Sequence, residues 1–277
     1  RVLNGLAWTA FSQVGMQVTR IVVALVVARL LTPSEYGLAA MALVFSSLVL
    51  IFSDLALGAA LVQRKTITAS DRDSAFWISV ASGLLFTVIG VGLSWPVARL
   101  YDQPEAQPLL AALSSTFLIT ALGATQQSLM LRDMQFRRLE MLPVAGALAG
   151  GLTGIAMAAA GAGAWAIIAQ QIIAITITTI LLWVRSDWRP GLQVSRASLR
   201  DLWGFSAPLL GQRLLYYVQQ NGDRFLVGRF IGTAALGVYA IAYNTILVPA
   251  ARLGGPLQRV FAPAFSRLQD EPDRIAA

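Results

Sequence analysis

The chain has 277 residues, of which 56% are hydrophobic and only 13% are charged, and its formal net charge is +7. Apolar stretches of about 20 residues recur along it, each long enough to cross a bilayer, so the composition predicts an integral membrane protein. The basic residues lie in short segments between the apolar runs, which excludes a nucleic-acid partner. The absence of Cys and His excludes disulfides, thiol nucleophiles and Cys/His metal sites, and we expect no cofactor and no metal.

Eight membrane spans are predicted in chain order from the apolar runs and the turn residues between them. They cover residues 3–31, 36–62, 74–100, 108–131, 140–160, 164–184, 202–231 and 236–260. The fold class is therefore all-α, a polytopic membrane helix bundle.

The loops between these spans differ in charge. Four turns, at residues 32–34, 102–104, 161–163 and 232–233, are expected on one side of the membrane, and most Arg and Lys residues between the spans fall on the other. The positive-inside rule places the basic side in the cytoplasm, which predicts a multi-pass protein with a cytoplasmic N-terminus.

The chain contains an internal repeat. Residues 27–42 (VARLLTPSEYGLAAMA) return at 227–242 (VGRFIGTAALGVYAIA), with Val, Arg, Gly, Ala and Ala identical at an offset of 200 positions. The second copy begins six spans after the first, an even number, so the repeat is parallel. We predict a six-helix lobe over 1–184, a cytoplasmic amphipathic linker over 185–201, and the first two helices of a second lobe over 202–277. We expect further helices after Ala277.

Polar residues inside the spans predict a cavity between the two repeats. Gln13, Gln17 and Arg20 share one helical face in the first span, and under the 200-residue offset they correspond to Arg213, Tyr217 and Gln220 in the seventh. A charge at mid-bilayer costs at least about 2.5 to 3.5 kcal/mol, so it normally faces a partner or a water-filled cavity. The candidate substrate-binding set is Arg20, Arg213, Arg224, Arg252, Gln13, Gln17, Tyr217, Gln220 and Asn244.

Two acidic residues leave alternatives open. Asp54 in the second span is either a structural partner of Arg20 or part of an ion-coupling site. Asp223 is either a helix-end partner of Arg224 or a site for a coupling proton or sodium ion. Arg213 and Arg252 have no acidic residue at suitable spacing in their own spans, which favours contact with substrate.

The chemistry of the buried bases points to a phosphate-bearing anion. Every basic residue inside a span is Arg, whose planar guanidinium grips phosphate oxygens in a bidentate manner and stays charged when dehydrated. The residues Tyr216, Tyr217, Gln219, Gln220 and Asn221 suggest stacking and hydrogen bonding to sugars. No paired catalytic carboxylates and no large loop domain are present, which argues against a membrane glycosyltransferase or polymerase.

Four segments resemble a known family: VARLLTPSEYGL (27–38), DLALGAALVQR (54–64), GDRFLVGRFIGTAALGVYAIAYN (222–244) and PAFSRLQDEPDR (263–274). They are similar to the polysaccharide transporter, or O-antigen flippase-like, branch of the multidrug/oligosaccharidyl-lipid/polysaccharide flippase superfamily. The resemblance implies a bacterial inner-membrane protein with two lobes. It implies that cavity arginines bind the pyrophosphate of a lipid-linked oligosaccharide, and Arg20, Arg213, Arg224 and Arg252 occupy comparable places.

The leading functional prediction is therefore a non-enzymatic flippase for an isoprenoid-pyrophosphate-linked oligosaccharide in surface polysaccharide biosynthesis, working by alternating access. Its expected partners are this lipid-linked substrate, the membrane lipids and the polysaccharide synthesis machinery. The alternative is a cation-coupled multidrug exporter of the same superfamily. Such an exporter needs acidic residues in its cavity, whereas here only Asp54 and Asp223 stand against several Arg.

Overall fold

The computed structural model describes residues 15, 17, 19, 21–53, 61–62, 67–192 and 215–247, and within these ranges it consists of helices joined by short turns and loops, with no strands. The labelled helices are α2 (Pro33–Ser53), α4 (Ala69–Leu100), α5 (Ala106–Arg132), α6 (Phe136–Ala159), α7 (Trp165–Arg185) and α9 (Thr233–Ala242), with π-helical turns η1 (Val227–Ile231) and η2 (Tyr243–Leu247). A first helix, Ile21–Leu30, precedes α2. Within these ranges, α4, α5, α7 and residues 137–159 of α6 are long and apolar enough to cross a membrane. The predicted helical membrane bundle is confirmed.

Local sequence signals explain where two of the helices begin. The Thr68 hydroxyl accepts a hydrogen bond from the Asp71 backbone N–H, and the Asp71 side chain accepts one from the Thr68 backbone, which forms a capping box. Thr32 and Glu35 make the same reciprocal pair before α2. The capping box at Thr68 starts α4 at Ala69, five residues before the predicted start at residue 74, because it satisfies free backbone N–H groups of the additional turn.

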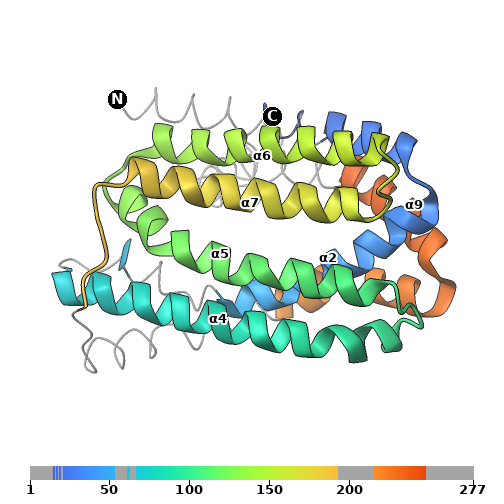
Figure 1. Ribbon diagram of the computed structural model, residues 1–277, viewed down its shortest axis with the longest axis horizontal. Coiled ribbons are helices and arrows are strands. Elements are labelled where there is room, and N and C mark those ends of the chain that lie inside the picture. Colours follow the sequence, from blue (N-terminus) through green and yellow to red (C-terminus); the bar gives the residue numbers. More distant parts are fainter. Residues whose placement is uncertain are drawn as a thin grey trace, which may run out of the picture.

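Helices α4 to α7 pack in a row, with α4 against α5 and α5 against α7. In Figure 1, α6, α7, α5 and α4 follow one another across the bundle. Both α5 and α6 pack extensively on α7 but hardly contact each other. Gly146, Gly150 and Gly154 form the ridge of α6 that meets α7, and a Cβ at Gly150 would collide with the Gln170 carbonyl oxygen. Small residues let helices approach closely in a membrane, and they fix α6 against α7 here.

The four predicted turns gather at one end of the bundle. The Arg229 guanidinium, just before the turn at 232–233, forms a 2.9 Å salt bridge with Asp102 in the turn at 102–104. Glu35, just after the turn at 32–34, lies so close to Gly163 in the turn at 161–163 that a Cβ there would be 2.7 Å from its carboxylate. At the opposite end, the Trp77 indole N–H donates to the Gly191 carbonyl at 2.8 Å, and the Gly191 N–H donates to Asp73 at 3.0 Å. Within the described residues, the four turns lie at one end of the bundle (Figure 1), as predicted. The predicted amphipathic helix of the linker lies outside the described residues.

The two copies of the repeat cross each other at equivalent glycines. A Cβ added at Gly37 would collide with the Thr233 carbonyl and would lie 3.0 Å from the Gly237 backbone N. A Cβ added at Gly237 would collide with the Pro33 carbonyl and would lie 3.0 Å from the Gly37 backbone N. Both pairs, Gly37 with Gly237 and Pro33 with Thr233, are 200 positions apart. The contact is therefore reciprocal, as an interface around a twofold axis is.

The copies differ in the turn that leads into this crossing. In the first copy the Leu31 N–H donates to the Val27 carbonyl, as in an α-helix. In the second copy the Gly232 N–H donates to the Val227 carbonyl, five residues back, and Gly232 has φ of 112°. Only glycine adopts that backbone conformation without strain, which explains why glycine stands where the first copy has its capping Thr32.

We expect Gly37→Ala and Gly237→Ala each to destabilise the protein, by about 1 to 3 kcal/mol or more, because the added methyl meets backbone atoms that cannot rotate away. The melting temperature of the detergent-solubilised protein measures this effect.

Gly92→Ala is the matched control, since a Cβ at this position in α4 meets no atom within 4 Å. Alanine forms helices better than glycine, so the control should keep or raise the melting temperature. Equal melting temperatures for Gly37→Ala, Gly237→Ala and wild type would contradict the close crossing.

Candidate functional site

A cavity of about 370 Å³ lies between the helices that carry and flank the two copies of the repeat. The first helix, α2 and α7 line one side of it. The helical residues 215–226, which lead into the second copy, and η2, which follows that copy, line the other. The described lining residues are Gln17, Ile21, Ala24, Val27, Tyr36, Leu43, Ile167, Gln170, Gln171, Arg224 and Asn244. The cavity thus brings together three residues of the predicted substrate-binding set, Gln17, Arg224 and Asn244.

Arg224 is the one charged residue among these lining residues. Its guanidinium lies over the Tyr243 ring, 4.1 Å from the ring centroid, and its buried Nε has no hydrogen-bond partner. A cation over an aromatic face gains about 0.5 to 2 kcal/mol, which is less than the cost of holding a charge within the bilayer. Arg224 is therefore held in place without an ion-pair partner for its guanidinium among the described residues.

The carboxylate of the neighbouring Asp223 is hydrogen-bonded to groups other than the Arg224 guanidinium. Its carboxylate accepts hydrogen bonds from the Tyr239 hydroxyl and from the Arg224 backbone N–H, the latter at 2.8 Å. Within the described ranges, no ion pair joins the Asp223 carboxylate to the Arg224 guanidinium. Asp223 thus fixes the backbone at Arg224 and ties it to α9, and it leaves the guanidinium facing the cavity.

Two further predicted residues lie behind the cavity wall. The Tyr243 hydroxyl donates to the Gln220 side-chain oxygen at 3.0 Å, so Gln220 positions the ring on which Arg224 rests. The Tyr217 hydroxyl donates to the Val44 carbonyl of α2 at 2.7 Å, which joins the second copy of the repeat to the first. Neither residue is among those that line the cavity.

Uncharged polar groups complete the wall. The side-chain oxygen of Gln17 is buried and has no hydrogen-bond partner. Sequence reasoning missed Tyr36, Gln170 and Gln171, which line the same cavity. Adjacent glutamines in the apolar span 164–184 are a detectable signal, because amides in a membrane helix need a hydrogen-bonding partner or water.

The other members of the predicted site, namely Gln13, Arg20, Asp54, Arg213 and Arg252, lie outside the described residues. The structure gives no side-chain geometry for them, so the pairing of Arg20 with Asp54 stays one of two predictions.

Comparison with known proteins identifies the family. Residues 26–277 match the family described as polysaccharide biosynthesis protein. The chain belongs to this family. The polysaccharide transporter branch predicted from the sequence is thereby confirmed, and the chain is a multi-pass membrane protein.

Three curated relatives illustrate the family. The chain is 27% identical over 277 residues to the lipopolysaccharide biosynthesis protein WzxC of Escherichia coli and 28% identical over 270 residues to the teichuronic acid biosynthesis protein TuaB of Bacillus subtilis. It is 23% identical over 273 residues to the succinoglycan biosynthesis transport protein ExoT of Rhizobium meliloti. The alignments cover 99%, 96% and 99% of this chain but only 56%, 56% and 55% of the relatives. No solved structure matches the chain.

The geometry of this polysaccharide biosynthesis family member suits an anionic guest. A guanidinium with an unpaired buried Nε, with amide groups around it, offers a charge and several hydrogen bonds to phosphate oxygens. A permanent carboxylate partner would compete with such a guest, and the described lining residues include none.

Replacing Arg224 by methionine should therefore keep or raise the melting temperature of the substrate-free protein. The substitution removes a charge whose burial costs at least about 2.5 to 3.5 kcal/mol, against a smaller loss of the contact with Tyr243.

Arg229→Met is the comparison variant, because the Arg229 guanidinium is paired with Asp102 and its removal should lower the melting temperature slightly. A large drop for Arg224→Met would contradict the absence of a counter-charge.

Proposed function

We propose that the chain is part of a flippase that moves an isoprenoid-pyrophosphate-linked oligosaccharide across the bacterial inner membrane during surface polysaccharide biosynthesis. The single observation that carries this proposal is Arg224, a charge that has no carboxylate partner among the described residues and that lines a cavity between the helices carrying the two copies of the repeat. The names of WzxC, TuaB and ExoT connect these relatives with the biosynthesis of lipopolysaccharide, teichuronic acid and succinoglycan. The chain spans just over half the length of these relatives, so the activity proposed is that of the whole protein.

In this proposal the pyrophosphate binds Arg224, and the remaining predicted arginines, Arg20, Arg213 and Arg252, add to the same cationic site. Gln13, Gln17 and Asn244 donate hydrogen bonds to the headgroup, and the isoprenoid tail stays in the bilayer. Binding needs no covalent chemistry, so the protein is a transporter and not an enzyme. The substrate is supplied from the cytoplasmic side by the polysaccharide synthesis machinery.

Alternating access requires the two lobes to separate at one end while they close at the other. The contacts between Gly37 and Gly237 and between Arg229 and Asp102 close the end that carries the four short turns. The positive-inside rule places this end outside the cell, with the N-terminus in the cytoplasm. Asp54 and Asp223 are the residues through which a proton or sodium gradient would drive the cycle.

The alternative, a cation-coupled multidrug exporter, is less well supported. A cationic drug would meet Arg224, and the described lining residues offer no carboxylate to bind it.

Depletion of the full-length protein should leave lipid-linked oligosaccharide on the cytoplasmic leaflet, because the pyrophosphate and sugars cannot cross the bilayer unaided. Leaflet distribution is measured by the accessibility of the glycan to an external glycosidase or lectin. An unchanged distribution would contradict the proposal, and extrusion of cationic dyes would favour the multidrug exporter.

Within the same assay, Arg224→Ala should reduce glycan export by at least about tenfold, and Arg224→Lys should restore only part of it, because an ammonium lacks the bidentate geometry. Arg138→Ala is the matched control, since Arg138 is exposed in the first turn of α6. Normal export by Arg224→Ala, with wild-type amounts in the membrane, would remove Arg224 from the site.

A further inference from the structure

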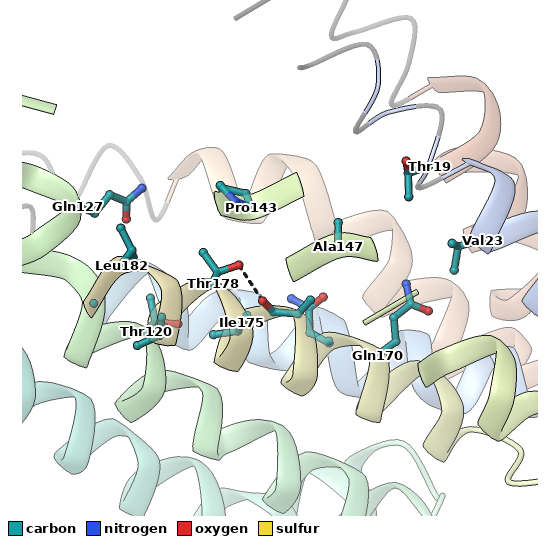
Figure 2. A pocket seen from close by; sticks show the side chains of 14 residues that line it. Thr19, Val23, Thr120, Gln127, Pro143, Ala147, Gln170, Ile175, Thr178 and Leu182 are labelled. Carbon is teal, nitrogen blue, oxygen red and sulfur yellow. Dashed lines mark hydrogen bonds between the residues drawn. The ribbon is translucent and has the colours of Figure 1, made fainter. Parts of the chain in front are cut away.

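A second cavity, of about 280 Å³, lies inside the first lobe and is shown in Figure 2. It lies beside α7, between α5 and α6, which hardly contact each other. Residues Thr19 and Val23 near the start of the first helix line the side of the cavity away from α7. The described lining residues are Thr19, Val23, Thr120, Gly123, Gln127, Pro143, Ala147, Gln170, Gln171, Ala174, Ile175, Thr178, Thr179 and Leu182. A liquid water molecule takes about 30 Å³, so the space holds much more than one.

The lining chemistry suits a neutral hydroxylated ligand. None of the fourteen described lining residues is charged, yet seven of them are Thr or Gln. An anion or a cation would find no opposite charge among these residues, and an apolar ligand would leave the amides without partners. Hydroxyl groups both donate and accept hydrogen bonds, as amides do, and a sugar ring has apolar C–H faces that suit Val23 and Ile175.

Several of these polar groups are available to a ligand. The hydroxyls of Thr178 and Thr179 donate to the Ala174 and Ile119 carbonyls at 2.7 and 3.1 Å, so their oxygens remain as acceptors. The half-buried amides of Gln170 and Gln171 make no hydrogen bond within the described ranges. The amides supply donors and the hydroxyls supply acceptors along one stripe of α7.

This cavity adjoins the arginine-containing cavity. Gln170 and Gln171 line both of them. The arginine-containing cavity, at about 370 Å³, is at the small end of ligand-binding cavities, so a pyrophosphate leaves little room there for several sugars. The glycan of a bound substrate therefore needs a neighbouring polar space.

We infer that the cavity between α5, α6, α7 and the first helix is a sugar-binding subsite, which takes the glycan of the substrate while Arg224 takes its phosphate. The inference rests on the proposed function and adds to it a division of the substrate between two sites. Gly146 of α6 packs against the Thr178 side chain and Gly154 packs against the Gln170 side chain, and these contacts hold both side chains in place as the ligand enters.

The test compares two substrates in proteoliposomes that contain the full-length protein. One is a polyprenyl pyrophosphate that carries a single N-acetylglucosamine, and the other is the same lipid with a complete repeating unit isolated from the source strain. The double variant Thr178→Val, Gln127→Leu changes two residues that line this cavity and not the arginine-containing one. It should slow translocation of the complete unit about three- to tenfold, because it removes hydrogen bonds to hydroxyls. Translocation of the single-sugar lipid should stay within twofold of wild type.

Thr176→Val is the matched control, because the Thr176 hydroxyl donates to the carbonyl four residues back, as that of Thr178 does, but does not line the cavity. An equal effect of the double variant on both substrates, an equal effect of Thr176→Val, or no effect of any variant would overturn the subsite and leave a water-filled cavity. The variant Arg224→Ala distinguishes failure of the subsite from failure of the proposed function. If the proposed function is wrong, Arg224→Ala translocates both lipids as fast as wild type.

A second measurement does not depend on transport rates. In a full-length protein in which Thr178→Cys provides the only cysteine, a hydrophilic maleimide should label the cavity, and the complete lipid-linked unit should protect it. The single-sugar lipid should protect it much less. Equal labelling with and without the complete unit would overturn the subsite.

Discussion

The close crossing of α2 and α9 at Gly37 and Gly237 is the constraint on which the rest of the described structure depends. Two helices that carry side chains at these positions cannot approach so closely, since each glycine faces the backbone of the other helix. The crossing brings the second copy of the repeat against α2, where Tyr36, Met41, Leu236 and Ala240 form a shared core. It thereby places Arg224 opposite the first helix and α7, and the cavity between the repeats follows from it.

The charge of the site depends on which groups the carboxylates of the second copy and its neighbours bind. Asp223 is bound to the Tyr239 hydroxyl and the backbone, and Asp102 is bound to Arg229 at the end of the bundle. Arg224 rests instead on an aromatic ring, which supports a cation without neutralising it. In the proposed flippase, an anionic substrate that enters the cavity supplies the negative charge that the described part of the protein does not pair with Arg224. The proposed site thus trades stability of the empty protein for affinity toward the substrate.

The two cavities divide the chemistry between a charged region and a neutral one. Gln170 and Gln171 stand at the boundary, on a helix that α6 fixes through its glycine ridge. A lipid-linked glycan has the same division, with a phosphate next to the lipid and hydroxyl groups beyond it. The proposed flippase thus recognises the phosphate strongly and the sugars through replaceable neutral hydrogen bonds. Neutral hydrogen bonds contribute about 1 kcal/mol each, so sugar recognition can be exchanged during evolution without loss of the headgroup site.

The sequence by itself determined the membrane class, the order and alternation of the spans, the repeat and the family, because apolar runs of fixed length and turn residues act locally along the chain. It also indicated Gln17, Arg224 and Asn244, since polar residues within apolar spans are conspicuous. Only the tertiary structure showed that Tyr36 and Gln170 share their cavity, that Tyr217 and Gln220 lie behind its wall, and that Asp223 is occupied by Tyr239. Those facts depend on how helices distant in sequence rotate and cross, and helical periodicity does not fix rotation between helices.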